Sequence, residues 1–497
     1  MNKDIVLTTI NAKWIHPSLA LRLLKANLGE LEDRCQIIEF ALRQPLQEKI
    51  DALVAAGPKI LGISVSIWNH AATLELLKEF ITQRRAPAAI ASSKDAKVVL
   101  GGPEVSYLPE NAEIFNYADY VIKGEGEIAF RKLCEDIITK KIKNNKFFSA
   151  PSVPLRSLRE IKTAYHLYTD QDIAQKLIYV EASRGCPFKC DFCLSAADKH
   201  PVREFPLEPF LSEMETLIKR GVKTFKFLDR TFNANIKRAI TIMEFFLKKL
   251  EGRSFTVHFE MVPTLFTTKL LETLARFPPG SLRLEIGIQT LNPEVAARIC
   301  LPRQTRLPGR QTFHPCDKIL ETLRFLREKT NAIIHADLIA GLPGETLESF
   351  AKGFDQLVAG TFSTGNATPQ VGVVTDTMFE IQLGILKQLP GTPITRHTKE
   401  WGMKYNPDPP YEVLETSTMN TKDLDRLKNF ARFWEIIVNR GCGKGTSYLV
   451  ENSKTVNFHQ FMELSDALLA RFGKNWGIDK DKLLAAILEI HGKMPYI

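Results

Sequence analysis

Three cysteines stand close together in the segment RGCPFKCDFC, as Cys186, Cys190 and Cys193 in a CxxxCxxC pattern. Thiolates at such spacing are typical metal ligands. Zinc sites usually take four ligands in two pairs, and no second Cys or His pair follows at the usual distance, so a zinc site would need a distant histidine. An iron-sulfur cluster fits better, because one loop can hold three of its irons. With three cysteines for four irons, one iron is left open to an outside ligand.

The segment resembles the cluster loop of the radical S-adenosylmethionine (radical SAM) superfamily, which has the same spacing and an aromatic residue, here Phe192, before the third cysteine. The resemblance implies that the open iron of a 4Fe-4S cluster binds the amino and carboxylate groups of SAM. It further implies that the reduced cluster cleaves SAM to a 5′-deoxyadenosyl radical, with an electron donor such as flavodoxin or ferredoxin.

Polar residues end the predicted strands that follow the cysteine loop. Asp229 ends the second strand, Glu260 the third and Gln289 the fourth, and Asp337 lies late in the fifth. Barrel enzymes carry their chemistry at the carboxyl ends of the strands, so these residues form a candidate ring, although a hydrogen-bonded loop residue is the commoner role for each alone. In related radical SAM families the positions of Glu260, Gln289 and Asp337 contact the ribose or methionyl part of SAM. Together with Phe192 and Asp229 they make up the expected SAM site.

The elements that must position these residues alternate between strand and helix. Alternation of this kind predicts parallel strands with crossover helices, an α/β fold. The predicted strands are 5–10, 35–40, 60–66, 98–100 and 120–122 in the first part of the chain, and 177–181, 224–228, 255–260, 282–288, 333–338 and 379–385 in the second.

Four regions follow from this pattern. Residues 1–145 are predicted to form a Rossmann-like (flavodoxin-like) domain, and the basic, irregular stretch KKIKNNKFFSAPSVP indicates a linker over 146–175. Residues 176–395 are predicted to form a partial (βα)6 TIM-type barrel, and 396–497 a mainly helical C-terminal domain. The segments QLPGTPI and YNPDPPYEVLETSTM resemble the end of one uncharacterised branch of the radical SAM superfamily that has its own C-terminal domain.

Four loops of the first domain, NAKWIHPS, SVSIWNH, GGPEVSY and KGEGE, follow predicted strands. Glycine lets a backbone approach a ligand closely, although a tight turn is the commoner reason for a glycine pair. The order strand, SxS, strand, GGP, strand, GEGE and then a CxxxCxxC barrel resembles the cobalamin-binding radical SAM proteins. The resemblance implies that the nucleotide tail of cobalamin lies between the SxS and GGP loops and that its corrin faces the barrel. The expected cobalamin contacts are Ser64, Ser66, Asn69, Gly101, Gly102, Pro103, Glu104, Gly124 and Glu125.

The DxHxxG motif, whose histidine ligates cobalt in cobalamin-dependent mutases and in the methionine synthase type, has no match in the chain. The lower axial position of cobalt is therefore expected to hold water or to be empty. His16 is the only nearby substitute, and an ordinary hydrogen-bonded loop histidine is the commoner role. Trp14 and Trp68 are candidates to pack on the corrin, although half-buried indoles are more common.

The composition, with 44% hydrophobic and 25% charged residues in 497, is that of a folded multidomain protein. No stretch approaches a membrane span and the N-terminus does not resemble a signal peptide, so we expect a cytoplasmic protein without a disulfide framework. The net charge of +9 permits an anionic partner without requiring one. Arg298, Arg303, Arg306 and Arg310 are candidates for phosphate contact, but a solvated basic loop is the simpler explanation. Cys442 is a candidate acceptor thiol, although idle cysteines are the norm.

These features predict a cobalamin-dependent radical SAM enzyme. By analogy, the radical would abstract hydrogen from an unactivated carbon, methylcobalamin would deliver a methyl group, and a second SAM would restore it. The alternatives are ring formation or rearrangement without methyl transfer, a non-catalytic cobalamin carrier or sensor, and a radical SAM enzyme whose first domain no longer binds cobalamin. The sequence leaves the substrate open among a small molecule, a peptide, a lipid and an RNA.

Overall fold

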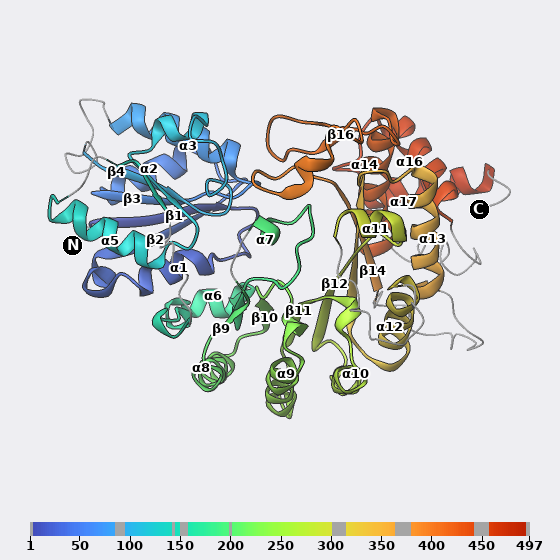
Figure 1. The fold of residues 1–497 in the computed structure, drawn as a ribbon, viewed down its shortest axis with the longest axis horizontal. Helices are drawn as coiled ribbons and strands as arrows, with labels where there is room; N and C mark the ends of the chain where they lie inside the picture. The colour runs from blue at the N-terminus through green and yellow to red at the C-terminus, as the bar shows by residue number, and fades with distance from the viewer. Residues whose placement is uncertain are drawn as a thin grey trace. The chain divides into compact units, whose positions relative to one another are not determined.

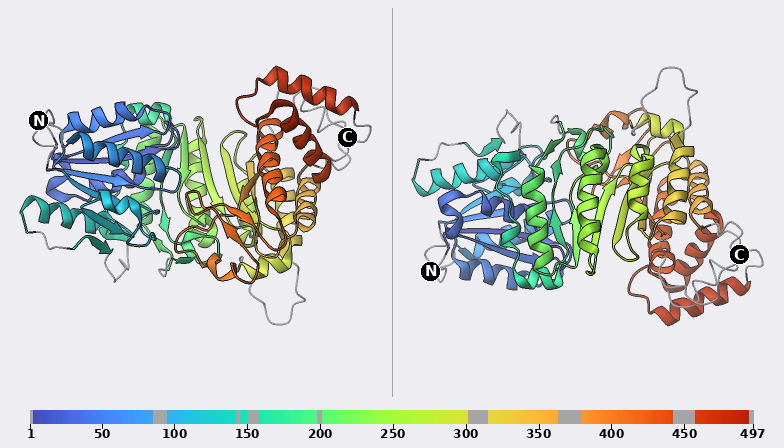
Figure 2. Two further views of the ribbon diagram at one scale, coloured as in Figure 1. Left: turned by 90° about the horizontal axis from the view of Figure 1, so that it is seen from above. Right: turned by 90° about the horizontal axis from the view of Figure 1, so that it is seen from below.

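The structure, a computed structural model, describes residues 3–84, 95–141, 145–149, 158–197, 201–300, 315–362, 379–441 and 457–493. The chain forms two units (Figures 1 and 2). The first consists of Met1–Gly185, His200–Leu228 and Asp408–Pro410, and the second of Cys186–Lys199, Asp229–Pro407 and Tyr411–Ile497.

A six-stranded parallel sheet forms the centre of the first unit. Its strand order is β2-β1-β3-β4-β5-β6, in which the order reverses between β1 and β3. This is the flavodoxin-like order extended by one strand, and ligands in such sheets bind at the carboxyl ends of the strands near the reversal. The strands are β1 (Ile5–Asn11), β2 (Cys35–Ala41), β3 (Ile60–Ser64), β4 (Lys97–Gly101), β5 (Tyr120–Lys123) and β6 (Phe147–Ser149).

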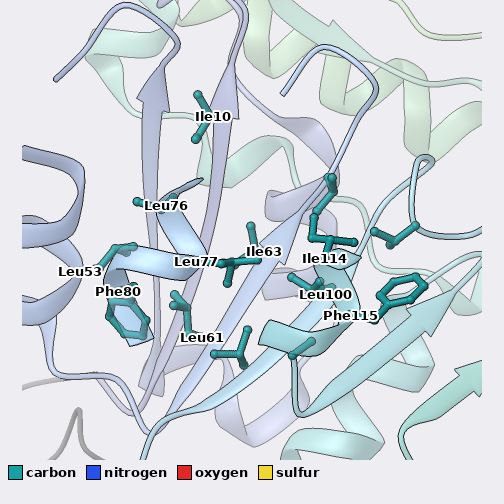
Figure 3. Close-up of a cluster of buried hydrophobic side chains, with 14 of the residues drawn as sticks. Ile10, Leu53, Leu61, Ile63, Leu76, Leu77, Phe80, Leu100, Ile114 and Phe115 are labelled. Carbon is teal, nitrogen blue, oxygen red and sulfur yellow. The ribbon is translucent and has the colours of Figure 1, made fainter. Parts of the chain in front are cut away.

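Helices cover both faces of this sheet (Figure 2). On one face, side chains of α2 (Leu46–Ala56) and α3 (His70–Arg84) pack against alternate residues of the strands (Figure 3). On the other face, α1 (Leu19–Ala26) and α5 (Glu127–Ile138) pack against the intervening residues. Because both faces are buried, the strands are nearly continuous apolar runs, which is why the sequence predicts them well.

The described parts of the segment expected to be a linker, 146–149 and 158–175, contain a strand, two 3₁₀ turns and a helix. Phe147 and Phe148 belong to β6, where their rings contact Phe115 and Tyr120 edge-on at centroid distances of 5.4 and 5.9 Å. A short aromatic pair inside a basic stretch offers too little periodicity to predict a strand. Further along, α6 (Asp170–Gln175) begins at a Thr169 capping box, and the 3₁₀ turns Leu158–Glu160 and Tyr165–Leu167 precede it.

The six strands expected of the partial barrel are all present. In the first unit, β7 (Ile178–Val180) pairs in parallel with β10 (Thr224–Phe227). In the second unit, β11 (Thr256–Met261), β12 (Leu282–Gln289), β13 (Ile333–Ala340) and β14 (Phe379–Ile385) pair in parallel in that order. The helices of this region are α7 (Leu194–Ala197), α8 (Leu207–Lys219), α9 (Ile236–Leu250), α10 (Thr268–Ala275), α11 (Pro293–Arg298), α12 (Pro315–Lys329) and α13 (Leu347–Phe362). A two-stranded hairpin, β8 (Ser183–Arg184) with β9 (Arg203–Glu204), completes the first unit.

The C-terminal helices belong to the second unit and share its core. Phe354 of α13 lies edge-on to Phe430 and Trp434, at centroid distances of 5.1 and 4.8 Å. Phe458 and Phe461 extend this aromatic cluster. The helices are α14 (Thr421–Trp434), which continues as a π-helical turn over Glu435–Asn439, α16 (Phe458–Phe472) and α17 (Lys480–Lys493), and a small hairpin pairs β15 (Lys404–Tyr405) with β16 (Val413–Glu415). In the described part of the chain, no helix has the length and apolar character needed to cross a membrane.

Candidate functional site

The cysteine loop lies between β8 and α7. Cys186, Cys190 and Cys193 are free thiols and all three are partly exposed. The amide of Cys193 donates to the carbonyl of Cys190 at 3.0 Å, which closes a tight turn between the last two thiols. The loop therefore presents three unpaired sulfurs within a short stretch of backbone.

The electrostatics of this loop favour a cationic centre. Burial, followed by the neighbouring thiols Cys193 and Cys186, raises the pKa of Cys190 to about 12. Three adjacent thiolates repel one another unless positive charge lies between them, and iron supplies it. Among the residues that the structure describes, no three His, Cys, Asp or Glu side chains are arranged to hold a single metal ion. A cluster does not need such convergence, because each thiolate binds a different iron.

Two neighbours of the cysteine loop come from elsewhere in the chain. The Thr231 hydroxyl lies 3.2 Å from the sulfur of Cys186. Asp191, inside the motif, is 2% exposed and contacts Nε2 of His397 at 2.8 Å. The sequence analysis missed Asp191 and His397, and nothing in the local pattern marks two residues so far apart as a pair.

Three expected SAM residues lie on neighbouring strands. Glu260 is near the end of β11, Gln289 ends β12, and Asp337 is in the second half of β13. Asp337 stands opposite Gly287, and a bulge follows between Gly287 and Gln289, where Gln289 adopts a φ of 68°. A Cβ atom on Gly287 would lie 2.6 Å from Nε2 of Gln289, so the amide of Gln289 folds back over the glycine. After the bulge, Gln289 stands opposite Leu338, the residue that follows Asp337 in β13.

The other two expected SAM residues have different environments. Phe192 is partly buried in the cysteine loop. Asp229 is 2% exposed in the segment that follows β10. A phenyl ring beside the thiols excludes water from them, and a buried carboxylate needs hydrogen-bond partners.

Glu345, in the loop after β13, is a buried carboxyl group that the sequence analysis did not single out. It is 1% exposed, and burial raises its pKa to about 7. Its Oε1 accepts a hydrogen bond of 2.7 Å from Thr290, directly after β12, while its Oε2 has no partner in the described part of the chain. Glu345 therefore joins the loops that follow β12 and β13.

The face of β11 to β14 that carries His258 and His335 is strongly polar. Along β12, residues alternate between fully buried and partly exposed, and the partly exposed positions include Arg283 and Glu285. Arg283 donates to Nε2 of His335 at 2.9 Å, and Nδ1 of His335 lies 2.8 Å from Glu380. Nδ1 of His335 also lies 2.9 Å from Nε2 of Gln382. His258 lies 3.2 Å from Glu285 on the same face.

In the first unit, Asn69 holds the loop after β3. Its Nδ2 donates to the carbonyl of Ile10 at 3.0 Å, and its Oδ1 accepts from the amide of Ser66 at 2.8 Å. The carbonyl of Ser64 accepts from Thr9 at 2.9 Å. Asn69 is fully buried, so its amide serves the protein and fixes the backbone that carries Ser64 and Ser66.

The glycine pair at the end of β4, Gly101 and Gly102, packs directly on this loop. The carbonyl of Gly101 accepts from the amide of Val65 at 2.8 Å. Gly102 has a φ of 105°, and a Cβ atom there would lie 2.5 Å from the carbonyl oxygen of Val65. Only glycine fits that position. Pro103 is exposed beside it, whereas Glu104 is 4% exposed and contacts Nδ1 of His70 at 2.9 Å.

The loop after β5 has a glycine at its tip and a carboxylate held by arginines. Gly124 has a φ of 88°, and its amide donates to Oγ of Ser106 in the loop after β4. Glu125 accepts two hydrogen bonds from Arg203, at 3.0 and 2.5 Å. Arg184 lies 3.7 Å from Glu125 and also pairs with two neighbouring carboxylates, the buried Glu127 and the partly buried Glu181. The carboxylate of Glu125 is therefore part of an ion network.

Large apolar side chains gather at the same edge of the sheet. Trp14 is 50% exposed and Trp68 is 55% exposed, on the loops after β1 and β3. Of the eight large hydrophobic side chains that are exposed in the described residues, five follow β1 to β4, namely Trp14, Ile15, Leu42, Trp68 and Tyr107. Apolar surface concentrated at one edge is typical of a ligand-binding face.

His16, the candidate cobalt ligand, already has a partner. Its Nδ1 lies 2.8 Å from the hydroxyl of Tyr179. Burial, together with Lys226 and Lys13, lowers the pKa of His16, so the ring is neutral. Cys442, Arg303, Arg306 and Arg310 lie outside the described residues.

Comparison with known families accounts for both groups of loops. The B12 binding domain family matches residues 5–134, the Radical SAM superfamily matches residues 180–357, and a protein family of unknown function (DUF4080) matches residues 399–480. The chain carries a B12-binding domain followed by a radical SAM domain.

Individual relatives match parts of the chain. The tRNA-2-methylthio-N(6)-dimethylallyladenosine synthase of Verminephrobacter eiseniae is 23% identical over 342 residues, which cover 65% of this chain and 72% of that protein. The uncharacterized methyltransferase PH0819 of Pyrococcus horikoshii is 34% identical over 297 residues, which cover 56% of this chain and 62% of that protein. This chain thus spans less than two thirds of the second relative.

A solved structure shares the fold of the B12-binding and radical SAM domains. The radical S-adenosylmethionine methyltransferase TsrM of Kitasatospora setae, with tryptophan substrate and a SAM analogue bound, has a TM-score of 0.60 at 17% identity and covers 99% of both chains. Another structure of TsrM, with cobalamin and a [4Fe-4S] cluster bound, has a TM-score of 0.57 at 18% identity and covers 81% of both chains.

Proposed function

We propose that this protein is a cobalamin-dependent radical SAM methyltransferase that methylates an unactivated carbon. The observation that carries the proposal is the loop of three free, partly exposed thiols in a chain that also has a B12-binding domain. A cobalamin carrier or sensor has no need for a loop that leaves one iron of a cluster open.

In this proposal, Cys186, Cys190 and Cys193 each bind one iron. Phe192 shields the cluster, and Asp229, Glu260, Gln289 and Asp337 hold SAM at the carboxyl ends of the strands. Support comes from the bulge that carries Gln289 over Gly287, next to the strand of Asp337. When bound, the cluster and cobalamin would supply reductive cleavage of SAM to a 5′-deoxyadenosyl radical and a transferable methyl group.

Cobalamin would lie against the loops after β1, β3, β4 and β5. Ser64, Ser66, Gly101, Gly102, Pro103 and Gly124 would approach it directly, while Asn69, Glu104 and Glu125 would hold these loops in place through the contacts described above. Trp14 and Trp68 would cover its apolar surface.

The polar face of β11 to β14 supports a polar substrate. Lipid tails need apolar pockets, whereas this face carries Arg283, Glu285, His335 and Glu380. We therefore favour a small molecule or peptide with several hydrogen-bonding groups over a lipid.

The test is a measurement of iron, sulfide and cobalt after anaerobic purification with cobalamin supplied. We expect four irons and one cobalt per chain, as one cluster and one cobalamin require. The triple alanine variant of the three cysteines should lose the iron and retain the cobalt. A wild type without iron would refute the radical mechanism, and iron without cobalt would refute the role of the first domain.

Methyl transfer itself is tested with methyl-labelled SAM and a library of polar metabolites and peptides. Label in the product supports the proposal, and the mass gain separates a methyl group from a methylthio group. Production of 5′-deoxyadenosine and an altered product without label would indicate ring formation or rearrangement instead.

A further inference from the structure

Asp191 anchors the cysteine loop to two other segments of the chain through its backbone. Its amide donates to the carbonyl of Ile299 at 3.1 Å, and its carbonyl accepts from the amide of Ile394 at 2.9 Å. Ile299 follows α11, and Ile394 lies in a 3₁₀ turn, Pro393–His397. Two segments distant in sequence therefore hold the backbone of the cysteine loop at one residue.

The side chain of Asp191 is gripped by the same 3₁₀ turn. Oδ2 lies 2.8 Å from Nε2 of His397 and 2.6 Å from Nη2 of Arg396. A carboxylate only accepts, so the contact with His397 is a hydrogen bond in the tautomer that carries the proton on Nε2, and Nε of Arg396 lies 3.2 Å from the same nitrogen. Asp191 and His397 are both buried, at 2% and 6% exposure, whereas the side chain of Arg396 is half exposed. The aspartate thus has one buried donor and one donor at the surface.

Residues of the C-terminal region hold the 3₁₀ turn Pro393–His397 in place. The carbonyl of His397 accepts from the amide of Trp401 at 3.0 Å, and the carbonyl of Trp401 accepts from Ser417 at 2.8 Å. The ring of Trp401 stacks under Arg298, whose guanidinium carbon lies 4.2 Å from the ring centroid. Trp401 and Ser417 lie within residues 399–480, the stretch matched by the family of unknown function.

We propose that Asp191, His397 and Arg396 form a brace by which the C-terminal region positions the cluster loop. His397 is a positioning residue in this proposal, which rests on the proposed cluster. Asp191 directly follows Cys190 and precedes Cys193 by two residues. Anchoring Asp191 therefore fixes the position of the backbone that carries both thiols. Groups that orient metal ligands in this way affect metal affinity by about 10- to 100-fold when removed.

The experiment measures how fast a ferrous chelator removes iron from the reconstituted full-length protein. For His397→Ala we expect release about tenfold faster than in the wild type, with an altered EPR spectrum of the reduced cluster. His397→Gln keeps an N–H donor and should restore slow release in large part. Arg396→Leu removes the donor at the surface and should accelerate release to a smaller degree.

The matched control is Asn439→Ala. Asn439 is 7% exposed and hydrogen-bonded to both backbone groups of Ile381, so its removal breaks a similarly buried polar anchor of β14. We expect it to lower the melting temperature of the iron-free protein without faster iron release. Equal release from His397→Ala and Asn439→Ala would overturn the brace.

Two further outcomes are informative. Should His397→Ala not fold, the comparison of Arg396→Leu with the wild type decides, and unchanged release and an unchanged EPR spectrum in that variant would overturn the proposal. A wild type that binds no iron would refute the proposed function instead, so the two failures are distinguishable.

Discussion

Gly102 shows at the scale of one residue how closely the loops of the B12-binding domain are packed. A Cβ atom at this position would lie 2.5 Å from the backbone of Val65, at a φ that side chains rarely adopt. We expect Gly102→Ala to lower stability by about 1–3 kcal/mol and to weaken cobalamin binding at least tenfold. Absorbance titration with cobalamin and thermal unfolding measure the two effects.

Gly101→Ala is the control for this prediction. A Cβ atom there would meet only the carbonyl of Ile122, at the ordinary distance of 3.7 Å. It should leave the melting temperature nearly unchanged. If both variants bind cobalamin as the wild type does, the loops after β3 and β4 are not its site.

Glu345 gives a pH dependence with a defined sign. Its pKa is raised by burial from an ordinary value of 4.5 to about 7, so between these values the folded state keeps a proton that the unfolded state has lost. Stability from this group is therefore fully present below about pH 4.5 and is lost as the pH rises through 7, by on the order of 3 kcal/mol.

Glu345→Gln removes this loss. We expect the melting temperature of the variant to exceed that of the wild type by a margin that grows from about pH 5 to pH 8. Glu348→Gln, at an exposed position in the same unit, is the control and should show no such margin. A constant difference at every pH would contradict the assignment.

Sequence reasoning at this scale predicts residue types and strand ends but not partners. The cysteine motif and the positions of Gln289 and Asp337 on their strands could be predicted, because both depend on local spacing in the sequence. His397 is 206 residues from Asp191, and their contact depends on the packing of segments that no local pattern connects. For the same reason the sequence did not distinguish Asn69, whose side chain hydrogen-bonds to the protein backbone, from Ser64.

At the scale of elements, the bulge that ends β12 is the most specific feature of the radical SAM domain. Gly287→Ala would place a Cβ atom 2.6 Å from Nε2 of the Gln289 side chain and displace that side chain. Losing one ligand hydrogen bond of about 1.4 kcal/mol corresponds to a tenfold weaker affinity for SAM, which equilibrium dialysis with the reconstituted protein measures.

Gly384→Ala in β14 is the matched control, because the nearest atom to its Cβ would be the carbonyl of Leu338 at 3.7 Å. It should bind SAM as the wild type does. Wild-type affinity in Gly287→Ala would remove Gln289 from the site.

Most elements could be predicted from sequence, because buried parallel strands form continuous apolar runs and barrel strands alternate strictly. The predicted strand 333–338 is observed as β13 over Ile333–Ala340, for example. β6 was missed, since Phe147 and Phe148 become a strand only through contacts with Phe115 and Tyr120. Its stability comes from tertiary packing rather than from its own pattern.

At the scale of the whole molecule, the first unit extends well beyond the residues matched by the B12 binding family. Tyr168 is buried, and its hydroxyl donates a hydrogen bond to the carbonyl of Tyr179. Arg22 pairs with Asp172 at 2.8 Å. Arg184 and Arg203 satisfy the buried Glu127 and the nearby Glu125. A fragment of residues 1–145 lacks all of these partners.

We therefore expect a fragment of residues 1–228 to fold and to bind cobalamin, and a fragment of residues 1–145 to be unstable. Removing one partner of a buried ion pair costs about 3–5 kcal/mol, and the shorter fragment loses several such partners. Circular dichroism and cobalamin absorbance measure both properties. A stable, cobalamin-binding fragment 1–145 would contradict this extent of the domain.

The uncovered tryptophans at the edge of the B12-binding domain have a consequence for how the protein behaves inside a growing culture. Trp14 and Trp68 are at least half exposed, so newly made chains can associate through this apolar surface until bound cobalamin covers it. Vitamin supply during expression should then govern how much protein stays dispersed, and growth in vitamin-poor medium should yield mostly aggregates.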